Sequence, residues 1–424
     1  MIGFDVYLVG GCVRDIILKR TPKDFDIITS ADLIEVKRVF SRCEIVGRRF
    51  PICHVHMDGT TVEVSSFSTH KEKHIRSDIE CDKQDLTRWS NCLHRDFTIN
   101  GLMYDPYSKL VYDYFGGLED LKKAKIRTMI PATTSFEKDC ARILRGIRIA
   151  ARLGFSLSKE TATSMTALSS SILKLDKGRV MLEMNYMLSY GSAEASLRTL
   201  WKFGLLEIVL PIQAAYLVRN RFKRRDKRSN MLLTLFANMD KLLAPDRPSH
   251  SSLWIGILAF HKALSEHPRH PRVIATFCLA LHNGGDVAES VQISGSIKTE
   301  PKTMFEEVSE CGFIDTDSLV SEVMKLGRCV NQALSDMTDE DFVAGAMALY
   351  PRAPFSNMVF ISMPQYIRTC RVFDCVRYGN DNSFCRLGKR GRDINYEQLA
   401  LGGLVEVRHV FARIVFDTIY PIKG

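Results

Sequence analysis

Two acidic residues near the start of the chain, Asp24 and Asp26, have the spacing of a metal-binding pair. If residues 25–28 form a strand, both carboxylates point to one face and Phe25 packs into the core behind them. Two like charges held this close repel each other unless a cation lies between them. A pair of Mg²⁺ ions bound there would clamp a triphosphate for in-line displacement. The pair therefore predicts a magnesium site, with two solvated acids at a strand end as the alternative.

A glycine turn lies shortly before this pair, in the segment 8–15 (LVGGCVRD). The segment predicts a strand, a tight turn at Gly10 and Gly11, and the start of a helix. Glycine lets backbone N–H groups approach a bound group closely, and a helix N-terminus favours an anion. Arg14 adds a cation for a charge-assisted contact to a phosphate. The segment has neither a Walker loop nor a GxGxxG fingerprint, and an ordinary turn is the alternative.

A metal pair commonly needs a third carboxylate, and the sequence offers two candidates. Glu63 lies in the segment 62–65 (VEVS), where alternation places it opposite the buried valines. Asp96 lies in the segment 94–100 (HRDFTIN). The alternatives are an ordinary solvent-facing strand residue for Glu63, and for Asp96 a salt bridge with Arg95 or a turn bond to the backbone.

A run of arginines follows Asp139 at the point where helical patterns begin to dominate. Asp139 and Arg142 are i, i+3 neighbours on one face of a predicted helix, with Arg145 next along it and Arg148 further round. Such a pair can read a base edge, because the carboxylate accepts from the exocyclic amine of adenine or cytosine and the guanidinium donates to a ring nitrogen. The alternative is a helix salt bridge worth about 0.3–0.5 kcal/mol with spare arginines in water.

The elements that must position these residues fall into two regions. Over about the first 130 residues, short strand and helix patterns alternate, and amphipathic helices dominate from about Phe136 onward. The predicted strands are 6–9, 25–28, 52–57, 61–67 and 97–103, and the predicted early helices are 12–19 and 32–40. Within the strand 52–57, alternation sends His54 and His56 to one face and Cys53 to the other, which favours a structural strand over a metal site.

Two polar segments are predicted to lie outside regular elements. Residues 70–90 have mixed charge and no period, which predicts a mobile loop. Residues 219–228 (RNRFKRRDKR) form a basic block, which is either a solvated linker or helix face, or a patch that contacts phosphates.

Composition fits a globular chain of 424 residues with 46% hydrophobic and 25% charged residues, and excludes a disordered or fibrous one. The formal charge of +9 is mild support for a polyanionic partner. No run of about 18 apolar residues predicts a membrane span, and no targeting peptide is visible. The 12 cysteines are scattered, which favours reduced thiols in an intracellular compartment over a disulfide framework.

Taken together, these motifs resemble the class II RNA nucleotidyltransferases, which comprise the bacterial-type poly(A) polymerases and the tRNA CCA-adding enzymes. The resemblance covers about the first 210 residues and rests on four ordered motifs and a closing segment. These are 10–15 (GGCVRD), 24–26 (DFD), 95–100 (RDFTIN), 139–155 and 204–211 (GLLEIVLP). The segments 44–56 and 62–67 are most similar to the poly(A) polymerase branch.

The resemblance assigns a role to each candidate residue. Asp24 and Asp26 would hold Mg²⁺, two ions in all, and Asp96 would be the third catalytic carboxylate, with Glu63 as an alternative metal ligand. The nucleotide-binding set it implies is Gly10, Gly11, Arg14, Arg95, Asp139, Arg142, Arg145 and Arg148. Of these, the residues from Asp139 onward would read the base and face phosphates.

The resemblance also implies a fold and a function. The expected fold class is α+β, with a nucleotidyltransferase head (1–130), a helical neck that recognises the nucleotide (131–215) and a helical RNA-binding body (216–424). The expected activity is template-independent transfer of AMP from ATP to an RNA 3′ end, with release of pyrophosphate. The alternatives are a tRNA CCA-adding enzyme and a catalytically inactive RNA-binding relative.

The expected partners follow from that activity. They are an mRNA-like or tRNA 3′ end, ATP and in the CCA alternative CTP, with no membrane and with a monomer or weak dimer. The expected compartment is the cytoplasm. Only five residues precede Val6, where the family has a short helix, so a chloroplast or mitochondrial address remains open as a second expectation.

Three positions depart from the family pattern. Lys138 stands where the family has a glutamate before the base-reading aspartate, His94 replaces an arginine, and Ile149 stands where a phenylalanine is common. The charge reversal at Lys138 bears on nucleotide selection and is the reason for keeping the inactive alternative.

Overall fold

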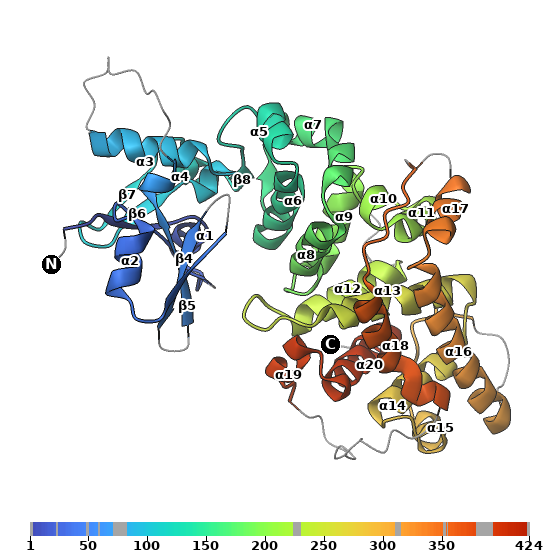
Figure 1. The fold of residues 1–424 in the computed structure, drawn as a ribbon. Coiled ribbons are helices and arrows are strands. Elements are labelled where there is room, and N and C mark those ends of the chain that lie inside the picture. Colours follow the sequence, from blue (N-terminus) through green and yellow to red (C-terminus); the bar gives the residue numbers. More distant parts are fainter. Residues whose placement is uncertain are drawn as a thin grey trace. The chain divides into compact units, whose positions relative to one another are not determined.

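The chain folds into two compact units, Met1–Leu168 and Ser169–Gly424. In Figure 1 the strands gather in the first unit, and the second unit is drawn as helices. The predicted α+β fold, a head with a mixed sheet followed by a helical region, is confirmed. The finer division with boundaries near 130 and 215 stays a prediction. The computed structural model describes residues 3–22, 24–47, 51–57, 60–70, 83–223, 230–309, 315–350, 353, 355–378 and 393–421.

A seven-stranded mixed sheet in the order β3-β4-β5-β2-β1-β6-β7 is the centre of the first unit. Its strands are β1 (Val6–Val9), β2 (Asp26–Thr29), β3 (Cys43–Val46), β4 (Ile52–Met57), β5 (Thr60–Ser66), β6 (Met103–Asp105) and β7 (Leu110–Tyr112). Only β2 and β5 run parallel, and the other neighbours are antiparallel. A small parallel pair, β8 (Lys125–Ile126) and β9 (Ser156–Leu157), lies apart from this sheet.

The alternation of β1 explains why its two faces pack against different helices. Tyr7 and Val9 point to one face and pack with Cys92 of α3 (Lys83–Leu93). Leu8 points to the other face and packs with a cluster that includes Cys12 of α1 (Gly11–Ile17) and Ile149 of α6 (Ala141–Leu153). The central strand is therefore covered on both sides by apolar contacts, which fixes the position of the glycine turn at its end.

The remaining helices of the first unit are short. α2 (Leu33–Val39) packs its buried face on β4 and β5 and begins with a capping box between Asp32 and Glu35. The others are α4 (Gly117–Lys122), α5 (Ala132–Lys138), α7 (Lys159–Ala167) and the 3₁₀ turns η1 (Phe67–His70) and η2 (Thr98–Asn100).

The described part of the second unit is helical throughout. Its core contains a set of packed aromatic rings, namely Phe260, Phe277, Phe373 and Phe411. The helices are α8 (Lys177–Leu188), α9 (Ala193–Lys202), α10 (Leu206–Val209), α11 (Pro211–Arg219), α12 (Met231–Leu242), α13 (Ser251–Glu266), α14 (Pro271–His282), α15 (Val287–Gly295), α16 (Thr316–Asp336), α17 (Glu340–Ala348), α18 (Met363–Tyr378), α19 (Tyr396–Leu401) and α20 (Leu404–Ile419), with the 3₁₀ turn η3 (Ser169–Lys174). In the described ranges, no helix has both the length and the apolarity to cross a bilayer.

The strand predicted at 97–103 is wrong over most of its length. Residues Thr98–Asn100 form the 3₁₀ turn η2, and β6 begins only at Met103. Polar side chains fix the turn, because Thr98 donates to Asp120 at 2.6 Å and Asn100 accepts from Arg14 at 2.7 Å. β-Branched residues alone therefore did not decide the backbone here.

The prediction of a loop over residues 70–90 is wrong for its last part. Residues from Lys83 onward form the helix α3. Arg88 stabilises this helix from the inside, and its guanidinium donates to the hydroxyls of Tyr7 and Tyr114 and to the carboxylate of Asp85. Sequence patterns count an arginine as polar and exposed, so they did not predict that this segment is a helix with a buried face. Residues 71–82 lie outside the described part, as do residues 224–228 of the basic block.

The alternation predicted for β4 is confirmed. Cys53 and Val55 are buried, while His54 and His56 are more exposed on the other face. Cys53 forms a disulfide with Cys43 on the neighbouring strand β3. The expectation of reduced thiols fails for this pair and holds for the seven other cysteines in the described ranges.

Candidate active site

Asp26 is the first residue of β2 and lies between two neighbouring strands. Its Cα partners are Val9 on β1 and Glu63 on β5. Directly paired residues in neighbouring strands place their side chains on one face, so the carboxylates of Asp26 and Glu63 are close. Burial raises the pKa of Asp26, the Glu63 and Asp24 carboxylates raise it too, and the Arg95 guanidinium partly offsets them. Three negative charges therefore influence one another at this edge of the sheet.

The residues just before β2 differ from the prediction. The strand begins at Asp26, so the alternation does not extend back to Asp24 and Phe25. The expectation that Phe25 packs into the core is wrong, since it is 39% exposed. Asp24 is exposed as well. One member of the acidic pair is thus held by the sheet, and the other lies on the segment that enters it.

Gly10 closes the turn between β1 and α1 beside this acidic edge. Its φ of +77° lies in the left-handed region, which residues with a Cβ rarely adopt. A Cβ at this position would lie 3.0 Å from Asp26 Oδ2 and 3.1 Å from Arg95 Nη1. The structure therefore brings together the turn, one metal-candidate aspartate and the arginine that the sequence singled out. The Nε atom of Arg95 is buried and has no hydrogen-bond partner among the described residues.

Arg14 is buried and belongs to a chain of polar side chains behind the turn. Its Nε donates to Asp15 at 2.8 Å and its Nη1 to the Asn100 Oδ1 at 2.7 Å. The Asn100 amide donates in turn to Asp96 Oδ1 at 3.0 Å, and Arg145 Nη1 lies 3.2 Å from Asp96 Oδ2. We call this chain of five residues the α1–α6 network. It connects the glycine turn with the helix that carries the predicted base-reading arginines.

Asp96 is held within this network on both carboxylate oxygens. Besides Asn100, its Oδ1 accepts from the Phe97 N–H at 2.7 Å. Burial opposes ionisation of Asp96, but the charge of Arg145 and the hydrogen bonds from Asn100 and Phe97 outweigh it and hold the pKa below its usual range. The acid that acts electrostatically on Asp26 from the neighbouring strand is Glu63.

Asp139 lies at the entry of α6 rather than on the helix. Its backbone is extended, with φ −151° and ψ 97°, in the two-residue link between α5 and α6. The prediction that Asp139 and Arg142 share a helix face is therefore wrong in detail, because the helix begins at Ala141. The carboxylate nevertheless reaches Arg142, with 3.9 Å between Asp139 Oδ2 and Arg142 Nε, and it also accepts from the Ala141 N–H.

Arg142 has two further partners that hold its guanidinium in place. Nη1 donates to Ser135 Oγ at 2.8 Å, and Nη2 donates to the His94 carbonyl at 2.9 Å. The second bond connects α6 to the segment just before Arg95. Arg148 lies half-buried further along α6, and Lys138 is exposed in the last turn of α5.

Two residues with central contacts here carried no signal of their own in the sequence. Asn100 joins Arg14 to Asp96, and Ser135 orients Arg142. Both are ordinary polar residues without a diagnostic spacing. The placement of Asn100 inside the segment 94–100 was the one available indication.

The donor set suits a magnesium ion that is bound together with a nucleotide. Among the described residues, no group of three or more His, Cys, Asp or Glu side chains is gathered closely enough to hold a metal by itself. Mg²⁺ is commonly bound by one or two carboxylates plus the phosphates of the substrate. Asp26 and Asp24 supply two carboxylates, and Glu63 is a third that lies beside Asp26.

Comparison with known proteins finds matches over the region that carries these residues. Residues 6–127 match the family model of the poly A polymerase head domain. The first unit thus resembles the head domain of that family, and the predicted resemblance is confirmed. Residues 154–217 match a second model, described as the probable RNA and SrmB-binding site of polymerase A.

The relatives belong to two named activities. Poly(A) polymerase I of Haemophilus influenzae is 31% identical over 252 residues, which are 57% of this chain and 55% of the relative. A CCA-adding enzyme of Geobacillus thermodenitrificans is 33% identical over 209 residues, 48% of this chain and 50% of that protein. The chain spans about half the length of the curated relatives it matches. Among solved structures, the Bacillus stearothermophilus CCA-adding enzyme in complex with CTP is 21% identical, with a TM-score of 0.48 over 88% of this chain and 89% of that one.

Proposed function

We propose that this chain is an RNA 3′-end nucleotidyltransferase that transfers AMP from ATP to RNA and releases pyrophosphate. The observation that carries the proposal is the meeting of Asp26, Gly10 and Arg95 at one edge of the sheet in a poly(A) polymerase-type head. Relatives named poly(A) polymerase I support transfer of AMP in particular. The partners in this proposal are ATP and an RNA 3′ end.

In this proposal the head binds the triphosphate through its backbone and through Arg95. The absence of a Cβ at Gly10 leaves the turn open beside Asp26 and Arg95, so a phosphate oxygen can approach the backbone N–H groups of the turn. The guanidinium of Arg95 supplies positive charge there. Arg14 supports the turn from behind, because its donors are directed to Asp15 and Asn100.

Asp24 and Asp26 would hold Mg²⁺, with Glu63 as the third carboxylate. When bound, the ion supplies charge that favours ionisation of the attacking 3′-hydroxyl and stabilises the departing pyrophosphate. The residues themselves contribute positioning, which is the main protein contribution in phosphoryl and nucleotidyl transfer. Asp96 is then a positioning residue, because its carboxylate is engaged by Arg145 and Asn100.

Asp139 and Arg142 are the proposed base-reading pair. The Asp139 carboxylate is half-exposed and can accept from the exocyclic amine of adenine. Arg142 is oriented by Ser135 and the His94 carbonyl, so its guanidinium is fixed relative to the segment that carries Arg95. Arg145 and Arg148 extend the cationic face of α6 toward phosphates.

Addition of CCA to tRNA is the second candidate, because relatives with that name match the same region at similar identity. Primer extension separates the two. The protein is given ATP alone, CTP alone or both, on a tRNA that lacks its 3′ end and on an unstructured oligonucleotide. A homopolymer of A on the oligonucleotide supports the proposal, and addition confined to the tRNA and completed only with both nucleotides would replace it by CCA addition.

The inactive alternative rests on Lys138, which reverses the charge next to Asp139. Against it stands the complete set of acids at the sheet edge. Incorporation of labelled ATP into the RNA primer that depends on Mg²⁺ excludes this alternative. A folded protein that binds RNA and incorporates nothing would establish it.

A further inference from the structure

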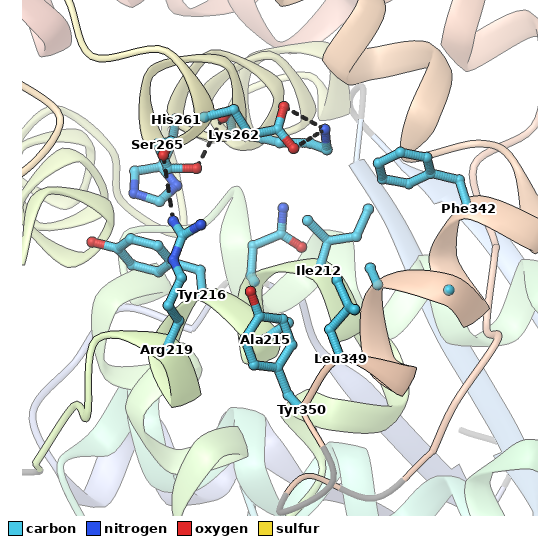
Figure 2. A pocket seen from close by; sticks show the side chains of 14 residues that line it. Ile212, Ala215, Tyr216, Arg219, His261, Lys262, Ser265, Phe342, Leu349 and Tyr350 are labelled. Carbon is cyan, nitrogen blue, oxygen red and sulfur yellow. Dashed lines mark hydrogen bonds and ion pairs between the residues drawn. The ribbon is translucent and has the colours of Figure 1, made fainter.

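A cavity of about 400 Å³ lies in the second unit, between α11, α13 and the end of α17. Its volume falls in the range of sites that bind small organic ligands. Figure 2 shows Phe342 on one side of the cavity and the pair Tyr216 and Arg219 on the other. None of these residues belongs to the site in the first unit.

The walls of the cavity offer flat, rigid surfaces. The Tyr216 hydroxyl donates to the buried Glu307 carboxylate at 2.6 Å, and the His261 ring packs edge-on against Tyr216 with 4.4 Å between centroids. Tyr216 is therefore fixed, and Phe342 and Tyr350 add aromatic surface from α17 and the residue stretch after it. Aromatic walls of this kind stack on the faces of nucleobases without regard to hydrogen-bond pattern.

Lys262 and Glu266 of α13 are the charged groups on one wall of the cavity. All donors of the buried Lys262 ammonium are directed to Glu266 and Asp336, at 2.7–2.8 Å, so none is left for a ligand. The exposed Glu266 carboxylate keeps acceptor capacity toward the cavity. An exocyclic amine suits this wall, whereas a phosphate or carboxylate does not.

The rim of the cavity at the end of α11 is basic. Arg219 is exposed at the end of α11, with its guanidinium 6.0 Å from the Tyr216 ring centroid, and Arg221 and Lys223 follow it as exposed residues. They form the described beginning of the basic block that the active site does not use. Arginine beside an aromatic face is a common support for a stacked base and its phosphate.

From the aromatic walls, the acceptor at Glu266 and the cation at Arg219 we propose that the cavity binds a nucleobase with an exocyclic amine, adenine in the first place, while its phosphate is held by Arg219. Uracil, which lacks that amine, is disfavoured. The base comes either from a residue of an RNA strand or from a free nucleotide, which are the two sources of this chemistry. This proposal rests on the proposed function in one point only, which is that the strand bound at the cavity is RNA.

Gly345 provides a direct test, because it lines the cavity on α17 and a Cβ there meets open space. Gly345→Trp fills the cavity, and Gly345→Ala is the matched control, which also removes a glycine from a helix. Arg219→Ala removes the rim charge, with Lys298→Ala as the control that removes an exposed charge outside the cavity lining. Thermal unfolding midpoints show that each full-length variant is folded.

Fluorescence anisotropy with labelled oligo(A) and oligo(U) is the binding measurement, and AMP is titrated separately as the free nucleotide. We expect Gly345→Trp and Arg219→Ala each to weaken oligo(A) binding about tenfold, the effect of losing one stacked base or its anchor. Both controls stay within about twofold, and wild type prefers oligo(A) to oligo(U). AMP binding that depends on Gly345 assigns the site to free nucleotide, and binding of the strand alone assigns it to RNA.

Equal oligo(A) affinities of Gly345→Trp and Gly345→Ala would overturn the proposal, and so would equal affinities of Arg219→Ala and Lys298→Ala. Primer extension is measured on the same samples. Failure of extension in wild type, with binding that still depends on Gly345, refutes the proposed function and leaves the cavity assignment. Normal extension with binding independent of both residues refutes the cavity assignment alone.

Discussion

Two acidic sites in the first unit differ in how their charges are satisfied. Asp96 is surrounded by donors, from Arg145, Asn100 and the Phe97 backbone, and its pKa is lowered. Asp26 is partly buried near two other acids, with Arg95 as the opposing charge, and its pKa is raised. The first site is satisfied by the protein itself. The second keeps negative charge that Arg95 only partly offsets, and a carboxyl with such a raised pKa is a candidate for a functional site.

The strongest way to break this comparison is Asp26→Asn. We expect turnover to fall by about 10³-fold or more, as for other groups that organise transition-state charge. The free energy of unfolding stays the same or rises, since a repelled charge is removed. Primer extension and thermal unfolding of the same sample measure the two effects. Turnover near the wild-type rate would refute the assignment.

Asp96→Asn should show the reverse pattern, a loss of stability. The buried Asp96 carboxylate accepts from Arg145, Asn100 and the Phe97 backbone, and because the substitution removes its charge from these bonds we expect the free energy of unfolding to fall by about 3 kcal/mol. Urea denaturation measures this change. A double-mutant cycle with Arg145→Gln is the control, and strictly additive effects of the two changes would show that the pair does not act as described.

Glu63→Gln sharpens the question of the third carboxylate. We expect kcat to fall by about a hundredfold, less than for Asp26, because Glu63 acts from the neighbouring strand. Asp96→Asn is the matched comparison, assayed at a temperature where both variants are folded. A larger loss of kcat for Asp96→Asn than for Glu63→Gln would return the third catalytic role to Asp96.

Arg142→Lys tests α6, the helix whose Arg145 contacts Asp96. Lysine keeps the charge but cannot bond Ser135 and the His94 carbonyl at once. The preference for ATP over CTP in kcat/KM should fall by about tenfold, the size of one lost charged hydrogen bond. Single-nucleotide extension with each triphosphate gives this ratio. An unchanged ratio would remove Arg142 from base selection.

The smallest expected effect is a dependence of stability on acid. Because the folded pKa of Asp96 is lowered, its contribution to stability is complete above the unfolded value of about 4 and is lost as the pH falls through the folded pKa. Unfolding free energies measured by urea between about pH 5 and pH 2 should therefore fall for wild type and fall less steeply for Asp96→Asn. Parallel curves would mean that Asp96 is not ionised in the folded protein.

Local patterns predicted those parts of the fold in which neighbouring residues decide the structure. The strands β1 and β4 begin and end where apolar or β-rich runs between turn residues placed them, and the turn at Gly10 follows from glycine itself. α3 was missed because its buried arginine is recognised only together with Tyr7 and Tyr114, which lie far away in the sequence.

The candidate site shows the same limit. The type and spacing of the acids and of the glycine turn suggest their chemistry, and their roles stay predictions. The bond between Arg14 and Asn100 joins residues 86 positions apart, and no periodicity within a short segment can reveal it. The sequence therefore predicts roles for Arg14 and Asp96 without the contacts that connect them.

The α1–α6 network makes the turn and the helix open as one unit. Because Asn100 accepts from Arg14 and donates to Asp96, neither neighbour can leave without exposing a buried charge on the other side. Backbone amides in α1 and α6 should therefore exchange with deuterium at similar rates, although the two helices lie far apart in the sequence. In Asn100→Ala the two rates should separate, and the glycine turn would then lose its fixed position relative to α6.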